Sequence, residues 1–287
     1  MRLSCRLQTR SDRMADKSQP PTAEDIKQFV EDKDDFALEL FAYRELLQHG
    51  WSARHGGAYI DPVTDKFRQF DLQAHKDWTP LRARIRMAAE CKNIDPIVPM
   101  IVSRVPRSAE DAFHCLISSG TNDLQVQTST AADAKPYHVD APVGKSVNQY
   151  QQKKNSQNQA GDDPYWKWAQ ALASCATLAT TAAHDAVRGL APSLQFVMPV
   201  LIVADHALWV VDYDSEGVPR KPQAATEATL FVDRIYEVHG QFNKLKYRVS
   251  HLHICTKAGF VQMLNELDKP TSQTMERIFR FGFLRLP

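Results

Sequence analysis

The spacing of apolar residues predicts a helix over residues 34–49, in the sequence DDFALELFAYRELLQH. Aspartates precede this run and Gly50 follows it, as expected at the two ends of a helix. Apolar side chains that recur every three or four residues form one stripe, which we expect to face the core. The stripe consists of Phe36, Leu40, Tyr43 and Leu47.

From residue 58 the apolar period changes to two, which predicts strands over 58–61, 67–75 and 85–92. The residues between the first two strands, Asp61-Pro62-Val63-Thr64-Asp65, predict the turn of a hairpin. Because alternate residues of a strand point to opposite faces, we expect the third strand to have one core face and one polar face. The core face has Ile85, Met87, Ala89 and Cys91, and the charged positions of the polar face are Arg84, Arg86, Glu90 and Lys92.

Beyond residue 92 the pattern predicts further helices and strands around a polar stretch. We expect residues 1–22 to be a disordered lead-in and residues 23–287 to form one elaborated domain with a polar excursion at about 121–161. The continuous apolar run 194–203 predicts a strand buried on both faces. The other predicted elements are helices at 108–118, from 164 onward and at 257–267, and strands at 209–213 and 248–256.

The composition is that of an ordinary globular protein, with 43% hydrophobic and 24% charged residues among 287. A formal net charge of +1 provides no global attraction to nucleic acid, so a polyanion needs a local site. Five cysteines, odd in number and far apart, are typical of reduced thiols in a cytoplasmic protein. No apolar run is long enough for a membrane span. The sequence leaves open whether Met1 or Met14 begins the protein.

Acidic and basic residues at matched positions of the second and third strands indicate a catalytic site. Asp71 and Gln73 alternate with apolar residues on the second strand, and Glu90 and Lys92 share the polar face of the third. If the two strands are antiparallel neighbours, Asp71 approaches Glu90. Two adjacent carboxylates are costly unless a cation lies between them, and Mg²⁺ prefers such oxygen ligands.

These residues resemble the split D…(D/E)-x-K signature of the PD-(D/E)XK, or restriction-endonuclease-like, nucleases. RQFDLQA at 68–74 is followed by AAECKN at 88–93, after a hairpin and an opening helix with Glu39 that are also similar to this class. One departure is that Phe70, not proline, precedes Asp71. The resemblance implies an α/β (α+β) fold whose central mixed sheet is flanked by helices in the order α-β-β-β-α-β, with extra elements toward the C-terminus.

The resemblance also implies a role for each residue. Asp71, Glu90 and the backbone carbonyl of Cys91 would hold Mg²⁺, for which Mn²⁺ substitutes, and Lys92 would orient the attacking water. Glu39 would contribute through a metal-bound water, and Gln73 would hold the nucleophile or the scissile phosphate. Four arginines are candidates for contacts to the DNA backbone, although arginines are also common on exposed strands: Arg84, Arg86, Arg104 and Arg107.

The function implied is a DNA endonuclease, similar to type IV restriction endonucleases and to Holliday-junction-resolvase-like domains. It would act in a restriction or anti-phage defence system with a partner protein, or as a homodimer that cuts both strands. Two alternatives stay open at this point. One is a structure-selective repair or resolvase-type nuclease, and the other is a nuclease fold that serves as a non-catalytic binding or assembly module.

Three further patterns predict structural roles. The segment 139–146 ends like a P-loop, but Val139 stands where that motif needs its first glycine, which excludes it. His251, His253 and Cys255 alternate on one strand face without a second ligand pair nearby in sequence, so we expect packing and not a metal site. Trp166 and Trp168, at the start of an alanine-rich helix, are expected to pack into the core.

Overall fold

The structure is a computed structural model of the chain, and it describes residues 20–78, 83–119, 126–132, 137–150, 164–188, 194–239 and 244–269. The chain divides into two units, residues 1–34 and 35–287. The described helix of the first unit is α1 (Ala23–Lys33), which the apolar spacing did not predict. The backbone N–H of Asp25 donates to Thr22 Oγ1 at 3.2 Å, and Thr22 N–H donates to Asp25 Oδ2 at 2.9 Å, which closes a capping box. Most of the predicted lead-in, residues 1–19, lies outside the described residues.

The second unit opens with helix α2 (Phe36–Gln48), as predicted. The helix ends at Gly50, whose φ of +71° suits a residue without a Cβ, and the N–H groups of Gly50 and Trp51 satisfy carbonyls of the last turn. The predicted stripe was wrong. Phe36, Leu40 and Leu47 are exposed, and the stripe that packs is Leu38, Ala42 and Leu46. Helix α2 is apolar on more than one side, so the sheet beneath it decides which side is buried.

The strands of this unit form one 12-stranded mixed sheet. The order along the sheet is β1-β2-β3-β8-β12-β11-β7-β4-β9-β10, and β5 pairs with β8 and β6. Strands β1, β2 and β3 form an antiparallel meander, whereas β3, β8 and β12 run parallel. Their bounds are β1 Ser52–Ile60, β2 Phe67–Trp78, β3 Ala83–Lys92, β4 Met100–Pro106, β5 Phe113–Ser119, β6 Val126–Ala132, β7 Pro142–Gln149, β8 Leu194–Val203, β9 Leu208–Asp212, β10 Gln223–Ala224, β11 Glu227–His239 and β12 Lys244–Thr256.

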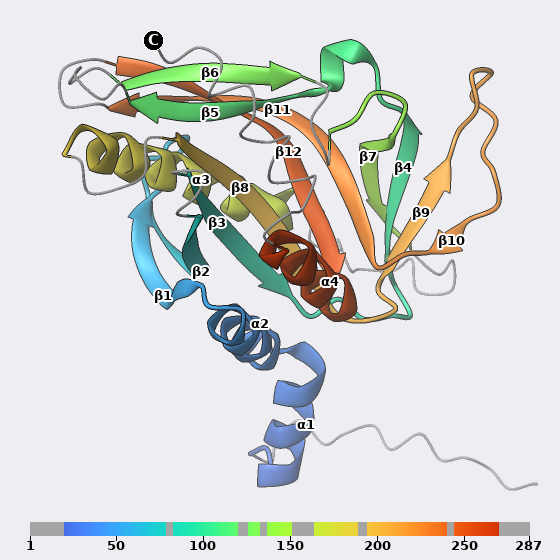
Figure 1. Ribbon diagram of the computed structural model, residues 1–287. Helices are drawn as coiled ribbons and strands as arrows, with labels where there is room; N and C mark the ends of the chain where they lie inside the picture. The colour runs from blue at the N-terminus through green and yellow to red at the C-terminus, as the bar shows by residue number, and fades with distance from the viewer. Residues whose placement is uncertain are drawn as a thin grey trace, which may run out of the picture. The chain divides into compact units, whose positions relative to one another are not determined.

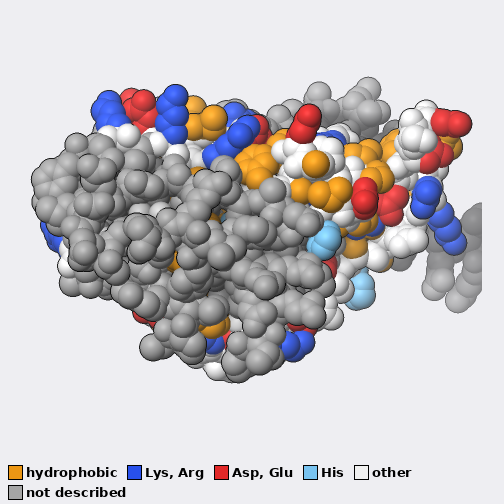
Figure 2. Space-filling view, turned by 45° about the horizontal axis from the view of Figure 1, so that its top comes forward, with side chains coloured by type: hydrophobic (Ala, Val, Ile, Leu, Met, Phe, Trp, Pro, Cys, Tyr) orange, Lys and Arg blue, Asp and Glu red, His pale blue; other side chains and the backbone are white. Residues whose placement is uncertain are grey.

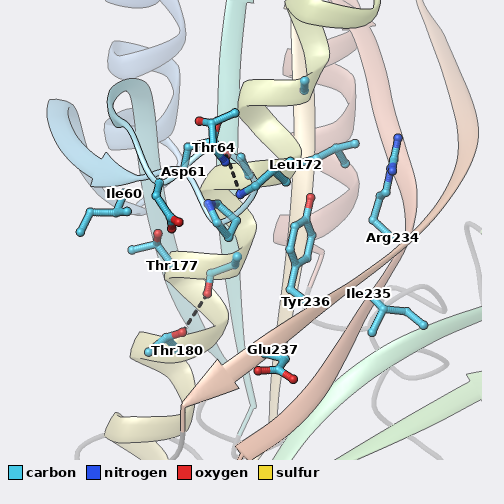
Figure 3. Close-up of a pocket in the computed structure, with 16 residues that line it drawn as sticks. Ile60, Asp61, Thr64, Leu172, Thr177, Thr180, Arg234, Ile235, Tyr236 and Glu237 are labelled. Atoms are coloured by element: carbon cyan, nitrogen blue, oxygen red, sulfur yellow. Dashed lines mark hydrogen bonds between the residues drawn. The ribbon is translucent and has the colours of Figure 1, made fainter.

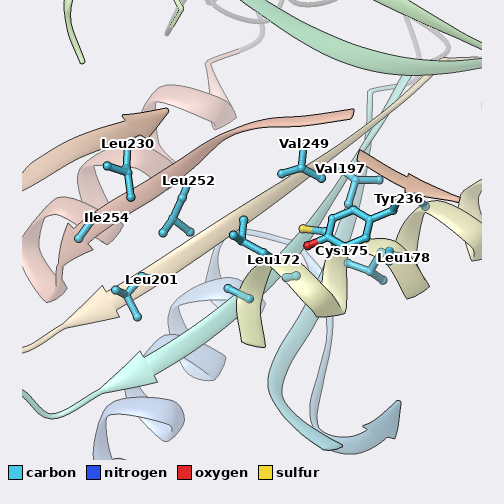
Figure 4. Close-up of a cluster of buried hydrophobic side chains, with 14 of the residues drawn as sticks. Leu172, Cys175, Leu178, Val197, Leu201, Leu230, Tyr236, Val249, Leu252 and Ile254 are labelled. Carbon is cyan, nitrogen blue, oxygen red and sulfur yellow. The ribbon is translucent and has the colours of Figure 1, made fainter. Parts of the chain in front are cut away.

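Helices cover both faces of this sheet (Figure 1). Helix α3 (Pro164–Val187) lies on one face, and α2 and α4 (Lys257–Asp268) lie on the other. Figure 4 shows Leu172, Cys175 and Leu178 of α3 gathered with Val197 of β8 and Leu252 of β12. Strand β8 is buried along its whole length between the two helical layers, as its apolar run predicts.

Several predicted elements are confirmed and others are corrected. The β1–β2 hairpin, α3, β8, β9, β12 and α4 are confirmed. The helix predicted at 108–118 is instead a short 3-10 turn (Ala109–Asp111) followed by β5, because the apolar run of β5 completes the sheet between β8 and β6. The polar excursion contains β6 and β7, and strands β4 and β11 were not predicted. None of the helices in the described part of the chain is long and apolar enough to cross a lipid bilayer.

Candidate active site

Strand β2 leaves β3 at the predicted catalytic residues and opens a notch in the sheet. The β2–β3 ladder ends at the Leu72–Ala89 pair, whereas β3 continues to pair with β8 as far as Lys92 and Val203. Gly56 on β1, with φ +64°, lies beside this point in the left-handed region that favours glycine. The backbone of residues 90–92 is therefore no longer held by β2, and side chains from neighbouring elements approach it. We call this region the notch.

Asp71 closes one side of the notch through a backbone contact. The N–H of Cys91 donates to Oδ2 of Asp71 at 2.7 Å. Because the N–H and C=O of one strand residue point the same way, the Cys91 carbonyl also points toward β2. Burial raises the pKa of Asp71, and the charges of Glu39 and Asp35 add to this, although the Cys91 bond and Lys92 oppose it. Asp71 is thus an acid in a negatively charged and partly desolvated site.

Glu90 and Lys92 lie side by side in the notch, with Glu90 buried and Lys92 partly exposed. Glu90 is 1% exposed, and its Oε1 lies 2.9 Å from Nζ of Lys92 but accepts no well-oriented hydrogen bond from the described residues. Burial, followed by the charge of Asp71, raises the pKa of Glu90 to about 8 against the effect of Lys92. Burial lowers the pKa of Lys92, but the nearby carboxylates, with Glu90 first, raise it above its ordinary value. The ammonium is therefore charged at neutral pH.

The polar face of β3 is not exposed, which corrects the two-faced strand predicted from parity. Helix α3 covers it, and every residue from Ala83 to Cys91 is buried. Tyr59 on β1 lies under the same helix, with its hydroxyl 3.5 Å from the carbonyl oxygen of Gln170. Burial, then Asp61 and Glu90, raise the pKa of Tyr59, and Asp71 also contributes. The carboxylates of Asp71 and Glu90 therefore both lie within electrostatic reach of one tyrosine.

Helix α2 supplies two carboxylates to the notch from the other face. Asp35, the N-cap residue, makes no side-chain cap bond to its own helix. Its Oδ2 accepts from Lys92 Nζ at 3.1 Å, and its Oδ1 accepts from the backbone N–H of Asn93. Glu39 pairs with His55 of β1, with 2.7 Å between Oε2 and Nε2. The sequence reasoning did not identify Asp35, His55 or Tyr59 as site residues.

Gln73, predicted to hold the nucleophile or the scissile phosphate, has a side-chain partner within the fold. Its Nε2 donates to Oγ of Ser174 on α3 at 3.0 Å, which ties β2 to the covering helix. Gln73 is therefore engaged in packing the helix over the sheet, and we do not retain it as a contact to the nucleophile. Glu39 is engaged by His55, and we do not retain it among the proposed metal ligands.

The remaining residues fit a divalent cation as an incomplete set of oxygen ligands. Asp71, Glu90 and the Cys91 carbonyl provide hard oxygen donors, and Glu90 Oε1 lacks a hydrogen bond that a cation or its water could supply. Within the described ranges no group of three or more His, Cys, Asp or Glu side chains is arranged to hold a metal ion. Waters or phosphate oxygens would have to complete the shell, as is usual for Mg²⁺.

The four arginines predicted to contact DNA are all engaged inside the protein. Arg84 bonds to both carboxylate oxygens of Asp77, and Arg86 bonds to Asp185 and Gln195 beneath α3. Arg104 makes a two-point contact with Asp212. Arg107 is buried, and it donates to the carbonyl oxygen of His138. Burial and carboxylate partners leave these guanidinium groups poorly placed to receive phosphates, because each would first have to break an internal contact.

On the face in Figure 2, lysine and arginine side chains are interspersed with acidic and apolar ones.

The segment at 139–146 leads into β7, and its Lys145 pairs with Asp111 at 2.6 Å, in keeping with the exclusion of a P-loop. His251 is buried and stacked on Tyr137 at 3.9 Å, and His253 contacts the Tyr137 hydroxyl at 2.7 Å, which agrees with a packing role. Trp168 packs partly buried against the core, whereas the side chain of Trp166 lies outside the described residues.

A cleft of about 850 Å³ lies near the notch, between the β1–β2 hairpin, α3 and β11 (Figure 3). Ala173, which lines it, also packs against Tyr59. The ionisable side chains that line the cleft are Asp61, Asp65, Glu237, Arg234 and Tyr236. Three of them are carboxylic acids and one is an arginine. An excess of carboxylates repels phosphates, so the charge of this cleft does not favour a polyanion.

A scan against protein-family models, a search of curated proteins and a search of solved structures each found no match for this chain.

Proposed function

We propose that this chain is a metal-dependent nuclease that hydrolyses phosphodiester bonds in DNA through Asp71, Glu90 and Lys92. The observation that carries the proposal is the buried Glu90 carboxylate, paired with Lys92 beside Asp71 where β2 leaves β3. An ion pair that only stabilised the surface would be exposed to solvent, and the pKa of its acid would not be raised. Strongly perturbed acids gathered in a notch are typical of catalytic centres.

The order of the elements also supports the proposal. Helix α2 precedes the β1–β2–β3 meander, and α3 leads into β8, which runs parallel to β3. This is the helix, three strands, helix and strand order expected for the PD-(D/E)XK class. Strands β4 to β7 are inserted between β3 and α3, and with β9, β10 and β11 they extend the sheet.

The chemistry follows from what each residue can do at the notch. Asp71, Glu90 and the Cys91 carbonyl would hold the metal ion. When bound, the ion lowers the pKa of water and neutralises charge on the phosphate. Lys92 is 22% exposed, so its ammonium can reach a phosphate oxygen and stabilise the charge that grows there. Asp35 holds that ammonium from the other side and limits its motion.

The decisive experiment incubates the protein with supercoiled plasmid and linear duplex DNA in Mg²⁺, Mn²⁺ or EDTA. Lys92→Met should lower metal-dependent cleavage at least about a hundredfold, the usual effect of removing one group that stabilises transition-state charge. Lys76→Met is the matched control, since Lys76 is 21% exposed and pairs with Asp268 at 2.6 Å away from the notch. Undiminished cleavage by folded Lys92→Met protein would remove the assignment.

The same experiment separates the two alternatives. Preferential cutting of branched over linear duplexes would favour a structure-selective, resolvase-type nuclease. DNA binding without turnover in either metal, unaffected by Lys92→Met, would favour a binding or assembly module instead.

A further inference from the structure

His55 and Glu39 form a histidine–carboxylate pair at the edge of the notch. The two side chains keep 24% and 18% of their surface exposed, so the pair is accessible from solvent. The His55 ring centre lies 5.6 Å from that of Phe36 and 6.0 Å from that of Tyr43. Two rings and one carboxylate thus hold the imidazole in a fixed orientation.

The pair lies next to the carboxylates of the notch. Glu39 lies one helical turn after Asp35 on α2, and Oδ2 of Asp35 contacts Lys92 Nζ at 3.1 Å. Glu39 is close enough to Asp71 for its charge to raise the pKa of that acid. Nε2 of His55 is directed to Glu39, whereas Nδ1 makes no hydrogen bond within the part of the chain that the structure describes. One ring nitrogen is thus anchored, and the other is available.

We propose that His55 donates the proton to the leaving oxygen of the phosphodiester, and that Glu39 is a positioning residue for His55 and not a metal ligand. This inference rests on the proposed nuclease function. Imidazole is the side chain best suited to give up a proton near neutral pH. A carboxylate on the far nitrogen fixes the orientation of the ring, which is how such pairs act in other acid–base sites.

The proton transfer balances without a further reactant. A bond forms between the water oxygen and phosphorus, and the bond from phosphorus to the leaving sugar oxygen breaks. The leaving oxygen takes the Nδ1 proton of the imidazolium, while the Nε2 proton stays hydrogen-bonded to Glu39. The attacking water releases its proton to solvent, and the neutral imidazole later regains one from solvent.

The test compares two substrates that differ in their need for a proton. DNA loses a sugar alkoxide, which must be protonated, whereas bis(p-nitrophenyl) phosphate loses a phenolate, which leaves without one. His55→Gln should lower metal-dependent DNA cleavage at least about a hundredfold and change hydrolysis of the phenyl ester less than about threefold, as expected for loss of a general acid. Retained ester hydrolysis also shows that the variant is folded, and His55→Asn serves as a second variant if it is not.

The matched control is His49→Gln, at the C-cap of α2. His49 also pairs with a carboxylate, with 2.5 Å from Nδ1 to Asp268, but it lies at the C-terminal end of α2 away from the notch. We expect it to leave both activities unchanged. Equal losses on both substrates by folded His55→Gln, or no loss on DNA, would overturn the assignment of His55. A wild-type protein that hydrolyses neither substrate in Mg²⁺ or Mn²⁺ would instead overturn the proposed nuclease function.

The positioning role of Glu39 has its own readout. Glu39→Gln should lower DNA cleavage while the Mg²⁺ concentration that gives half-maximal rate stays unchanged. Glu45→Gln is the control, because Glu45 is 20% exposed on the same helix and lies 4.0 Å from His49. A shift of the Mg²⁺ curve in Glu39→Gln alone would mean that Glu39 binds the metal ion, and it would overturn this part of the proposal.

Discussion

Replacing Glu90 with glutamine should stabilise the metal-free protein at alkaline pH while it abolishes cleavage. The reason is the buried carboxyl group, whose pKa is raised from 4.5 to about 8, mainly by burial and then by Asp71. The folded protein therefore holds this proton more tightly than the unfolded chain does. The free energy of unfolding must therefore fall as the pH rises from about 4.5 to about 8. Above that range the ionisation of Glu90 should no longer change it.

The magnitude follows from the same pKa. At about 1.4 kcal/mol for each tenfold change in proton affinity, the ionised group costs on the order of 5 kcal/mol over the whole range. About 1 kcal/mol of this cost falls between pH 7 and pH 8, where the folded state is still largely protonated. Glutamine has nearly the same shape and carries no charge, so it removes this cost. The smaller contribution of Asp71, whose pKa is also raised, remains.

The assay is urea unfolding in EDTA at pH 7 and pH 8 for wild type, Glu90→Gln and the control Glu45→Gln, whose partly buried glutamate lies on α2 away from the notch. Wild type and the control should lose about 1 kcal/mol of unfolding free energy over this step, and Glu90→Gln should lose clearly less. Parallel losses in wild type and Glu90→Gln would refute the reasoning, because they would mean that Glu90 is already ionised in the folded protein at pH 7.

Three more outcomes are expected. Mg²⁺ at a hundred times its Kd should raise the unfolding free energy of wild type by about 2.7 kcal/mol but not that of Asp71→Asn, as measured by urea titration. Asp35→Ser should keep or improve stability, because serine can cap α2, while it slows cleavage through loss of the Lys92 contact. Gly259→Ala should destabilise the protein by several kcal/mol in thermal unfolding, because the added Cβ would lie 1.9 Å from the Thr226 carbonyl oxygen. In an ordinary helix the same substitution stabilises by about 1 kcal/mol.

The sequence predicted the elements whose pattern is local and missed those that depend on tertiary contacts. The continuous apolar run 194–203 and the alanine-rich helix from 164 can each be recognised from neighbouring residues alone, and both are confirmed. A helix was predicted at 108–118 because its capping signal is local, whereas most of this segment belongs to β5, which pairs with β8 about eighty residues later. The buried side of α2 was also mispredicted, since several of its sides are apolar and only the sheet selects one.

The candidate site shows the same division between residues that share an element and residues that meet only in the fold. Glu90 and Lys92 could be paired from the sequence because alternate residues of one strand share a face, although nothing in that pattern predicted that α3 would bury the face. Asp35 and His55 carry no such periodic signal. Asp35 looks like a helix cap, and its carboxylate is redirected to Lys92 only because β3 ends beside the start of α2. His55 acquires its partner in the same way, because the β1 strand passes under the first turns of α2 and brings the imidazole to Glu39. A sequence pattern can therefore indicate which charges sit on one strand, whereas the groups that orient those charges come from a different element and are found only once the elements are packed.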